Sequence, residues 1–203
     1  MTPSPQSPLN PVHLLLVDDD RLVLSTLGTG LRNLGYQVST AECMADAETL
    51  LSGGQRPDLT ILDVRMPGGD GLMLARRLRE FYHLPFIMLS AYSDTDIVHS
   101  AAALGALGYL VKPLDAARMA PSIEAALLRG ADLRKLAANA EQLQHALNAE
   151  RDVGVAVGIT MAQNRLSRHA ALDVLRNASR TQRRKLADLA QDVVQSIDRV
   201  HGA

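Results

Sequence analysis

Short apolar runs recur along the first 112 residues, separated by longer segments in which polar and apolar residues mix. Continuous apolar runs are typical of parallel strands that are buried on both faces. Between them, leucines recur near helical spacing, as at Leu22, Leu24, Leu27, Leu31 and Leu34. The pattern predicts strands at 12–17, 37–41, 58–62, 85–90 and 108–111, and helices at 21–34, 44–51, 70–81 and 94–104. This alternation indicates an α/β fold with a five-stranded, parallel, doubly wound sheet.

Beyond residue 113 the pattern predicts helices alone. Small and apolar residues at alternating intervals of three and four fill the a and d positions of a heptad repeat: Leu133, Leu136, Ala140, Leu143 and Leu147. A seam this narrow favours a two-stranded coiled coil between two copies of the chain. The alternative is a helix that packs on its own domain.

Three further helices are expected at 151–164, 168–178 and 182–199, and Ser167 and Thr181 are suited to cap the last two. The chain thus divides into four predicted parts. They are a disordered tail at 1–11, an α/β domain at 12–128, a coiled-coil linker helix at 129–150 and an all-α, three-helix module at 151–203.

The two ends of the chain differ in net charge. Residues 1–112 carry 8 Lys/Arg against 12 Asp/Glu, whereas residues 151–203 carry 9 against 5, which suggests different partners for the two ends. The single cysteine, Cys43, excludes an internal disulfide and fits a cytoplasmic protein. No apolar run approaches the roughly 20 residues of a membrane helix. The proline-rich start does not read as a signal peptide.

Unusual polar residues fall at the ends of four predicted strands: Asp18-Asp19, Asp63, Ser90 and Lys112. In doubly wound folds the ligand site lies beyond the carboxyl ends of the strands. Three carboxylates gathered there repel one another unless they hold a cation, and hard oxygen ligands suit Mg²⁺. A carboxylate that attacks phosphorus forms an acyl phosphate, and a lysine and a hydroxyl nearby suit the phosphoryl group.

Four blocks of sequence resemble the receiver domains of two-component systems, and the resemblance covers about residues 12–128. The blocks are Val17-Asp18-Asp19-Asp20, Ile61 to Gly71, Met88-Leu89-Ser90-Ala91 and Gly108 to Pro113. The resemblance implies that Asp63 accepts the phosphoryl group from a sensor histidine kinase. It also implies that Asp19, Asp63 and the carbonyl of Arg65 ligate Mg²⁺, with Asp18 acting through water.

Further roles follow from the same resemblance. Lys112 pairs with the phosphoryl group, Ser90 closes on it, and Tyr109 rotates as the switch aromatic, although a packing role also suits this tyrosine. A second register, with Asp19-Asp20 as the acidic pair, is also compatible with the run of three acids.

The C-terminal segment at about 150–195 resembles the ANTAR domain, a three-helix RNA-binding module of transcription antiterminators. The best-matching pieces are Ala156 to Met161 and Lys185 to Ala190. Small residues at 156, 158 and 171 are expected to let the helices approach closely. Val157 stands where a basic residue is common, which suggests that an RNA contact is weakened or relocated.

Basic residues are the candidates for contact with RNA. Seven lie within 165–185, against the single acid Asp173: Arg165, Arg168, Arg176, Arg180, Arg183, Arg184 and Lys185. No aromatic residue follows Tyr109, so recognition would rest on shape, phosphates and arginine contacts.

These features predict a response regulator that is not an enzyme. Phosphorylated on Asp63, it would dimerise through the coiled coil and bind tandem RNA stem-loops to prevent transcription termination. Two alternatives remain. One is a DNA-binding response regulator, although no convincing helix-turn-helix is found. The other is an interaction protein that a sensor partner sequesters.

Overall fold

The computed structural model describes residues 11–67, 70–91 and 95–201. All but the last residue of the predicted tail at 1–11 therefore lies outside the described residues. The chain forms two compact units, residues 1–133 and residues 134–203, and each is described by itself. None of the helices in the described ranges combines the length and apolar character that a membrane crossing requires.

The first unit is built on a sheet of five parallel strands in the order β2-β1-β3-β4-β5. Its elements in chain order are β1 (His13–Val17), α1 (Arg21–Asn33), β2 (Gln37–Ala41), α2 (Met44–Ser52), β3 (Leu59–Asp63), α3 (Asp70–Arg77), η1 (Leu78–Tyr82), β4 (Phe86–Ser90), α4 (Thr95–Ala103), β5 (Tyr109–Val111) and the start of α5 (Ala116–Asn164). The predicted α/β fold class is confirmed.

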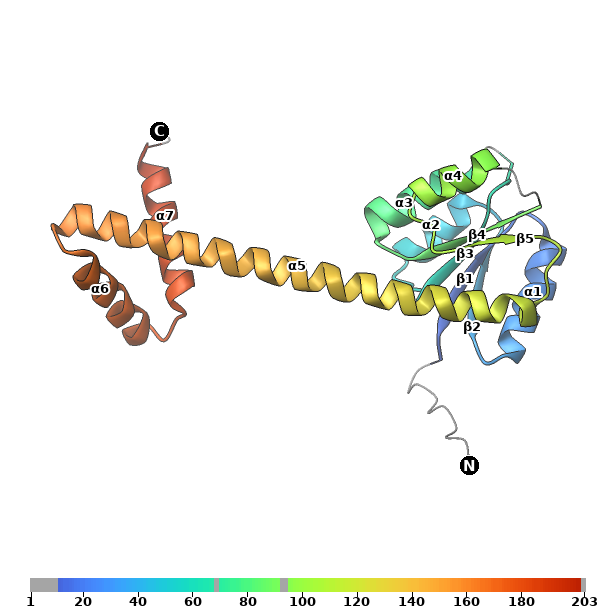
Figure 1. The fold of residues 1–203 in the computed structure, drawn as a ribbon, viewed down its shortest axis with the longest axis horizontal. Helices are drawn as coiled ribbons and strands as arrows, with labels where there is room; N and C mark the ends of the chain where they lie inside the picture. Colours follow the sequence, from blue (N-terminus) through green and yellow to red (C-terminus); the bar gives the residue numbers. More distant parts are fainter. Residues whose placement is uncertain (1–10, 68–69, 92–94, 202–203) are drawn as a thin grey trace, which may run out of the picture. The chain divides into compact units, whose positions relative to one another are not determined.

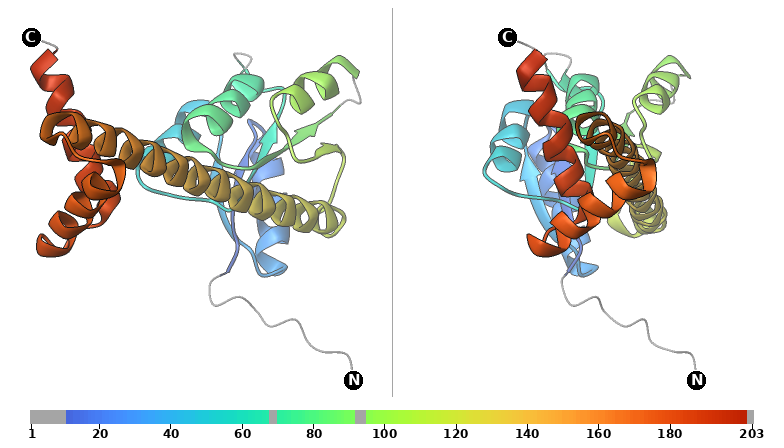
Figure 2. Two further views of the ribbon diagram at one scale, coloured as in Figure 1. Left: turned by 60° about the vertical axis from the view of Figure 1, so that its left-hand side comes forward. Right: turned by 90° about the vertical axis from the view of Figure 1, so that its left-hand side faces the viewer.

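Helices cover both faces of this sheet (Figures 1 and 2). Side chains of α2, α3 and α4 pack with one face of the strands in a core that includes Leu51, Leu74 and Phe86. On the other face, α1 and the first turns of α5 form a second core, in which Leu31 and Ile123 are fully buried. Burial on both faces explains why the strands are continuous apolar runs.

Two details of the first unit differ from the predicted helices. Leu22 and Leu34, at the two ends of the predicted 21–34 stripe, do not face the core, and their exposed fractions are 73% and 48%. The helix predicted at 70–81 is α-helical only to Arg77, and continues as a π-helical turn that ends at His83 in a left-handed conformation, with φ 52°.

Helix α5 is continuous through the predicted linker and the first predicted helix of the C-terminal module. The prediction of a separate helix at 151–164 is therefore wrong. Every residue from 132 to 148 is exposed, which includes the predicted seam. Its four leucines, at 133, 136, 143 and 147, have exposed fractions between 52% and 64%.

The second unit packs the end of α5 against α6 (Arg168–Thr181) and α7 (Leu186–His201). Ser167 caps α6 as predicted, since its hydroxyl accepts a hydrogen bond from the Ala170 N–H at 3.3 Å. The predicted cap at Thr181 is wrong. Its hydroxyl donates instead to the Asn177 carbonyl at 2.9 Å inside α6, and the next helix begins only at Leu186.

The small core of this unit explains two further corrections. Val157 is 5% exposed and packs among Ala156, Ala171 and Leu175, so it stands in the core and not at a lost RNA contact on the surface. Gly158 faces open space, with nothing within 4 Å of the position that a Cβ would take. The close approach expected there is made by the fully buried alanines at 156 and 171.

Candidate functional site

Acidic residues from β1 and β3 meet at the carboxyl edge of the sheet. Asp18 and Asp19 follow β1 directly, and Asp63 is the last residue of β3, the strand that pairs with β1. Asp18 is fully buried, Asp63 is 5% exposed, and Asp19 is exposed. One carboxylate oxygen from each of the three lies within 4.8 Å of the others, so these side chains could hold a metal ion together.

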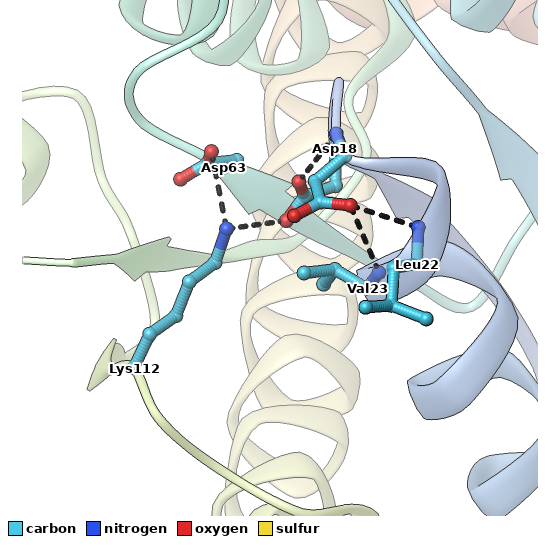
Figure 3. A network of polar contacts seen from close by, with 6 residues as sticks. Asp18, Leu22, Val23, Asp63 and Lys112 are labelled. Atoms are coloured by element: carbon cyan, nitrogen blue, oxygen red, sulfur yellow. Dashed lines mark hydrogen bonds and ion pairs between the residues drawn. The ribbon is translucent and has the colours of Figure 1, made fainter.

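Lys112, which follows β5, reaches between two of these carboxylates (Figure 3). Its Nζ lies 2.6 Å from Asp18 Oδ2 and 3.2 Å from Asp63 Oδ2. Its backbone N–H also donates to the Ser90 carbonyl at 2.7 Å, which ties the end of β5 to the end of β4. The sheet thus brings a partly buried cation into contact with two carboxylates that come from distant parts of the chain.

The third acid of the run, Asp20, serves a different purpose. It is the N-cap of α1, and its Oδ1 accepts hydrogen bonds from the Leu22 and Val23 N–H groups at 2.8 and 3.4 Å. Its own N–H donates to Asp18 Oδ1 at 3.0 Å. The structure therefore places Asp18 and Asp19 with Asp63, and Asp20 at a helix terminus.

Electrostatics in the site follow from burial and from the neighbouring charges. Burial raises the pKa of the Asp63 carboxyl above 3.8, the charge of Lys112 opposes this rise, and the Asp18 charge adds to it. For Lys112, burial lowers the pKa, but the hydrogen bond to Asp18 and the charges of Asp63 and Asp18 outweigh burial and raise the pKa above 10.5. Lys112 is thus charged at neutral pH.

The raised pKa of Asp63 has a direct consequence for the metal-free protein. The folded state holds the Asp63 proton more tightly than the unfolded chain does, so this group favours folding at low pH. Its contribution declines as the pH rises from about 3.8 through the raised folded-state pKa. At neutral pH the ionised Asp63 carboxylate therefore opposes folding, even with the Lys112 ammonium beside it.

Of the remaining predicted residues, Ser90 and Arg65 lie at this edge of the sheet, whereas Tyr109 lies at the start of β5. Ser90 is fully buried as the last residue of β4. Arg65 is exposed and lies two residues after Asp63. A backbone hydrogen bond from Arg65 to the Asp63 carboxylate opposes part of the rise in the pKa of that group. Tyr109 stands at the opposite end of β5 from Lys112, half-buried against the core under α2, α3 and α4.

Gly71 is a residue of the site for which the sequence suggested no role. A Cβ at this position would lie 2.4 Å from the carbonyl oxygens of both Asp63 and Val64, far inside contact distance. Only glycine therefore lets α3 begin directly against the loop that follows β3. A glycine in the first turn of a helix, close after a candidate phosphoacceptor, is the signal that could have revealed this role.

In the second unit, the side chains of the seven predicted RNA-binding residues are all exposed. Two of them pair with acids: Arg176 Nη1 lies 3.9 Å from Asp173 Oδ1, and Arg184 Nη1 lies 2.7 Å from Asp192 Oδ2. Within the part of the chain that the structure describes, the other five form no ion pair: Arg165, Arg168, Arg180, Arg183 and Lys185.

Comparison with known proteins agrees with this geometry. A family model of the response regulator receiver domain matches residues 14–124. The chain belongs to the response regulators. A model of the ANTAR domain matches residues 141–194, so this response regulator is a receiver domain followed by an ANTAR domain, as predicted.

Curated relatives are transcriptional regulators. The response regulator is 27% identical over 187 residues to the transcriptional regulatory protein PdtaR of Mycobacterium tuberculosis, covering 92% of this chain and 91% of the relative. It is 40% identical over 117 residues to the transcriptional regulatory protein AfsQ1 of Streptomyces coelicolor, covering 58% of this chain and 52% of the relative. The protein is thus a regulator and not an enzyme, as predicted.

Solved structures show the same receiver fold. A CheY-like receiver domain protein from Methanospirillum hungatei superposes with a TM-score of 0.56 at 21% identity, covering 61% of this chain and 98% of that one. A putative response regulator from Chloroflexus aurantiacus superposes with a TM-score of 0.55 at 34% identity, covering 59% and 99%. Receiver domains generally bind Mg²⁺ at an acidic pocket and take their phosphoryl group from a donor such as a histidine kinase, and the aspartate cluster fits both roles.

Proposed function

We propose that the protein is a transcription antiterminator that is phosphorylated on Asp63 and binds tandem RNA stem-loops as a dimer. The observation that carries this proposal is the joining of two sites in one chain. The aspartate cluster with Lys112 can accept a phosphoryl group, and an ANTAR module exposes seven basic side chains.

The arrangement of the pocket supports phosphorylation of Asp63. An Asp63 carboxylate oxygen attacks phosphorus, and the bond from phosphorus to the donor nitrogen or oxygen breaks, leaving an acyl phosphate on Asp63. Asp18, Asp19, Asp63 and the Arg65 carbonyl would hold Mg²⁺, which supplies positive charge for the developing phosphoryl oxygens. Lys112 is already within 3.2 Å of Asp63 and would pair with the phosphoryl group.

Lys112 also offers a route by which the pocket influences the rest of the protein. The Lys112 ammonium contacts both Asp18 and Asp63. A dianionic phosphoryl group on Asp63 would therefore draw Lys112 toward Asp63 and weaken its contact with Asp18. Only three residues separate Lys112 from Ala116, the first residue of α5. We propose that Ser90 closes on the phosphoryl group and that Tyr109 rotates as part of the same change.

The exposed seam on α5 supports a homodimer. A helix surface that keeps four leucines more than half exposed is unfavourable in a single chain, and pairing a and d positions between two copies would bury them. Two ANTAR modules held together would engage paired stem-loops with higher avidity than either module alone.

Metal binding should reverse the order of stability between the wild type and Asp63→Asn. In a chelator at pH 7 the variant should unfold at the higher temperature, because it lacks the ionised carboxylate that opposes folding. At an Mg²⁺ concentration of 100 times Kd the wild type should gain about 2.7 kcal/mol, and the variant less. Thermal unfolding followed by circular dichroism, with and without Mg²⁺, measures both. The same order in both conditions would contradict a metal site at Asp63.

The protein should bind RNA stem-loops in preference to duplex DNA, and its affinity for RNA should depend on exposed basic side chains. We expect tandem stem-loops to bind more tightly than duplex DNA at matched salt, with a log–log salt slope near −2 per module if about three phosphates are contacted. Replacing Arg180 and Lys185 with Ala should weaken this binding, because both are exposed and form no ion pair among the described residues. Filter binding against a salt series measures both quantities.

A matched control removes the same charge elsewhere. Arg118 and Arg129 are exposed on the receiver part of α5, and replacing both with Ala should leave RNA affinity unchanged. If the wild type binds duplex DNA as tightly as stem-loops, the DNA-binding alternative replaces the antiterminator. If it binds neither, the partner-sequestered interaction protein is the better description.

A further inference from the structure

Five helix ends of this protein share one closing geometry. In each, a residue in the left-handed conformation follows the helix, and the next N–H donates back to the carbonyl five residues earlier, as Tyr36 does to Leu31 at 3.2 Å. The equivalent bonds are Gln55 to Leu50, Ala106 to Ala101, Leu166 to Met161 and Arg184 to Ser179, at 3.1, 3.0, 3.2 and 3.0 Å.

At these five helix ends the left-handed residue differs between the two units. After α1, α2 and α4 it is Gly35, Gly54 and Gly105, with φ between 84° and 95°. After α5 and α6, in the ANTAR module, it is Arg165 and Arg183, with φ 54° and 53°. A further left-handed residue that is not glycine, His83 with φ 52°, follows η1 in the receiver, where the closing bond runs from the Leu84 N–H to the Leu78 carbonyl. Glycine adopts this conformation freely, whereas a side chain with a Cβ is unfavourable there and arginine has no short polar group to compensate locally.

We propose that Arg165 and Arg183, the corner arginines, stand at these backbone positions instead of glycine because they contact RNA phosphates at both ends of α6. This inference rests on the proposed function and selects, from seven exposed basic residues, the two that the backbone disfavours. Strained conformations that persist in a fold are often found at functional positions.

Charge and exposure support the role of the corner arginines. Both side chains are exposed, and neither forms an ion pair within the described ranges, whereas Arg176 and Arg184 are partly neutralised by Asp173 and Asp192. Their guanidinium groups are therefore available for bidentate contact with phosphate oxygens. The corner arginines flank a helix of 14 residues, which spans about 21 Å, so they would contact phosphates well apart on the RNA.

A different explanation is that each arginine stabilises the helix end that it follows. Basic side chains near a helix C-terminus interact favourably with the free carbonyls and the helix dipole. The two explanations predict opposite changes in stability when the arginines are replaced by glycine, so they can be separated by experiment.

The test compares two double variants of the full chain, Arg165→Gly with Arg183→Gly and Arg165→Ala with Arg183→Ala. Both should weaken binding to tandem RNA stem-loops at least tenfold and reduce the magnitude of the salt slope by about 1.4 per module, since two phosphate contacts are lost at about 0.7 each. Only the glycine pair relieves the backbone, and it should raise the unfolding temperature of the helical module by about 4–8 °C in total.

The two units can be followed separately in these measurements. All four tyrosines precede residue 110 and there is no tryptophan, so tyrosine emission reports on the receiver while far-ultraviolet circular dichroism includes the ANTAR helices. The reciprocal control is Gly54→Arg, at a left-handed position with open space around it. This variant should lower the unfolding temperature of the receiver domain and leave the affinity for RNA unchanged.

A glycine pair that unfolds at a lower temperature than the wild type would overturn the proposal in favour of helix-end stabilisation. A glycine pair with unaltered affinity and salt slope, beside a wild type that binds stem-loops, would overturn it while the proposed function stands. If the wild-type protein does not bind stem-loops, the proposed function is wrong, and this inference is wrong with it.

Discussion

Treatment with acetyl phosphate and Mg²⁺ should add one phosphoryl group to the wild-type protein and none to Asp63→Asn. The reason is geometric: Asp63 is the carboxylate that ends β3, beside the acids that would hold the metal and within 3.2 Å of the Lys112 ammonium. An anionic donor cannot approach three carboxylates unless a cation offsets their charge. Omission of Mg²⁺ should therefore also abolish labelling. Intact-mass spectrometry measures the result directly.

The matched control for this experiment is Asp20→Asn. Asp20 lies in the same acidic run, but its carboxylate caps α1, and asparagine caps helices equally well. Labelling should therefore survive in this variant. Equal labelling of wild type and Asp63→Asn would refute the phosphoacceptor assignment, and loss of labelling in Asp20→Asn would favour the other register of the acidic pair.

Placing charge on the α5 seam should abolish dimerisation while the receiver stays folded. The variant is Leu136→Glu with Leu143→Glu, at two d positions whose side chains are 64% and 62% exposed in a single chain. Burial of a leucine contributes about 1.5–3 kcal/mol, so the loss of two per chain exceeds what so short a coil can offset. Sedimentation velocity of the phosphorylated protein should show a monomer, with weaker binding to tandem stem-loops.

A control with the same charges and the same spacing uses the opposite side of the helix. Ala138→Glu with His145→Glu adds two acids at f positions, which face away from the seam. This variant should sediment like the wild type. A dimer that persists in the seam variant would place the interface elsewhere, on the receiver or on the ANTAR module.

The fold of the receiver could be predicted because its strands are short apolar runs whose ends carry the chemistry. Parallel pairing brings Asp18, Asp63 and Lys112 to one edge, although more than ninety residues separate the first from the last. The capping role of Asp20 could not be separated from metal binding by sequence alone, because an acid after a strand suits both.

The errors in the second unit have two physical origins. Thr181 has the chemistry of an N-cap, but the helix boundary is set two residues later by Arg183, which adopts the left-handed conformation without being a glycine. The burial of Val157 was also missed, because a small core of three helices uses positions that a resemblance to a family had suggested for contact with RNA.

The exposed middle of α5 has a consequence for how such proteins evolve. None of the side chains from 132 to 148 belongs to the core of either unit, so a genetic crossover within this stretch would exchange the output module without disturbing packing on either side. The constraint on such a recombinant would be the phase of the heptad. Insertions or deletions of seven residues, or of a multiple of seven, preserve the leucine seam. Insertions or deletions of other lengths rotate the leucines out of register. The stretch is thus a site where receivers and effectors could be shuffled as modules.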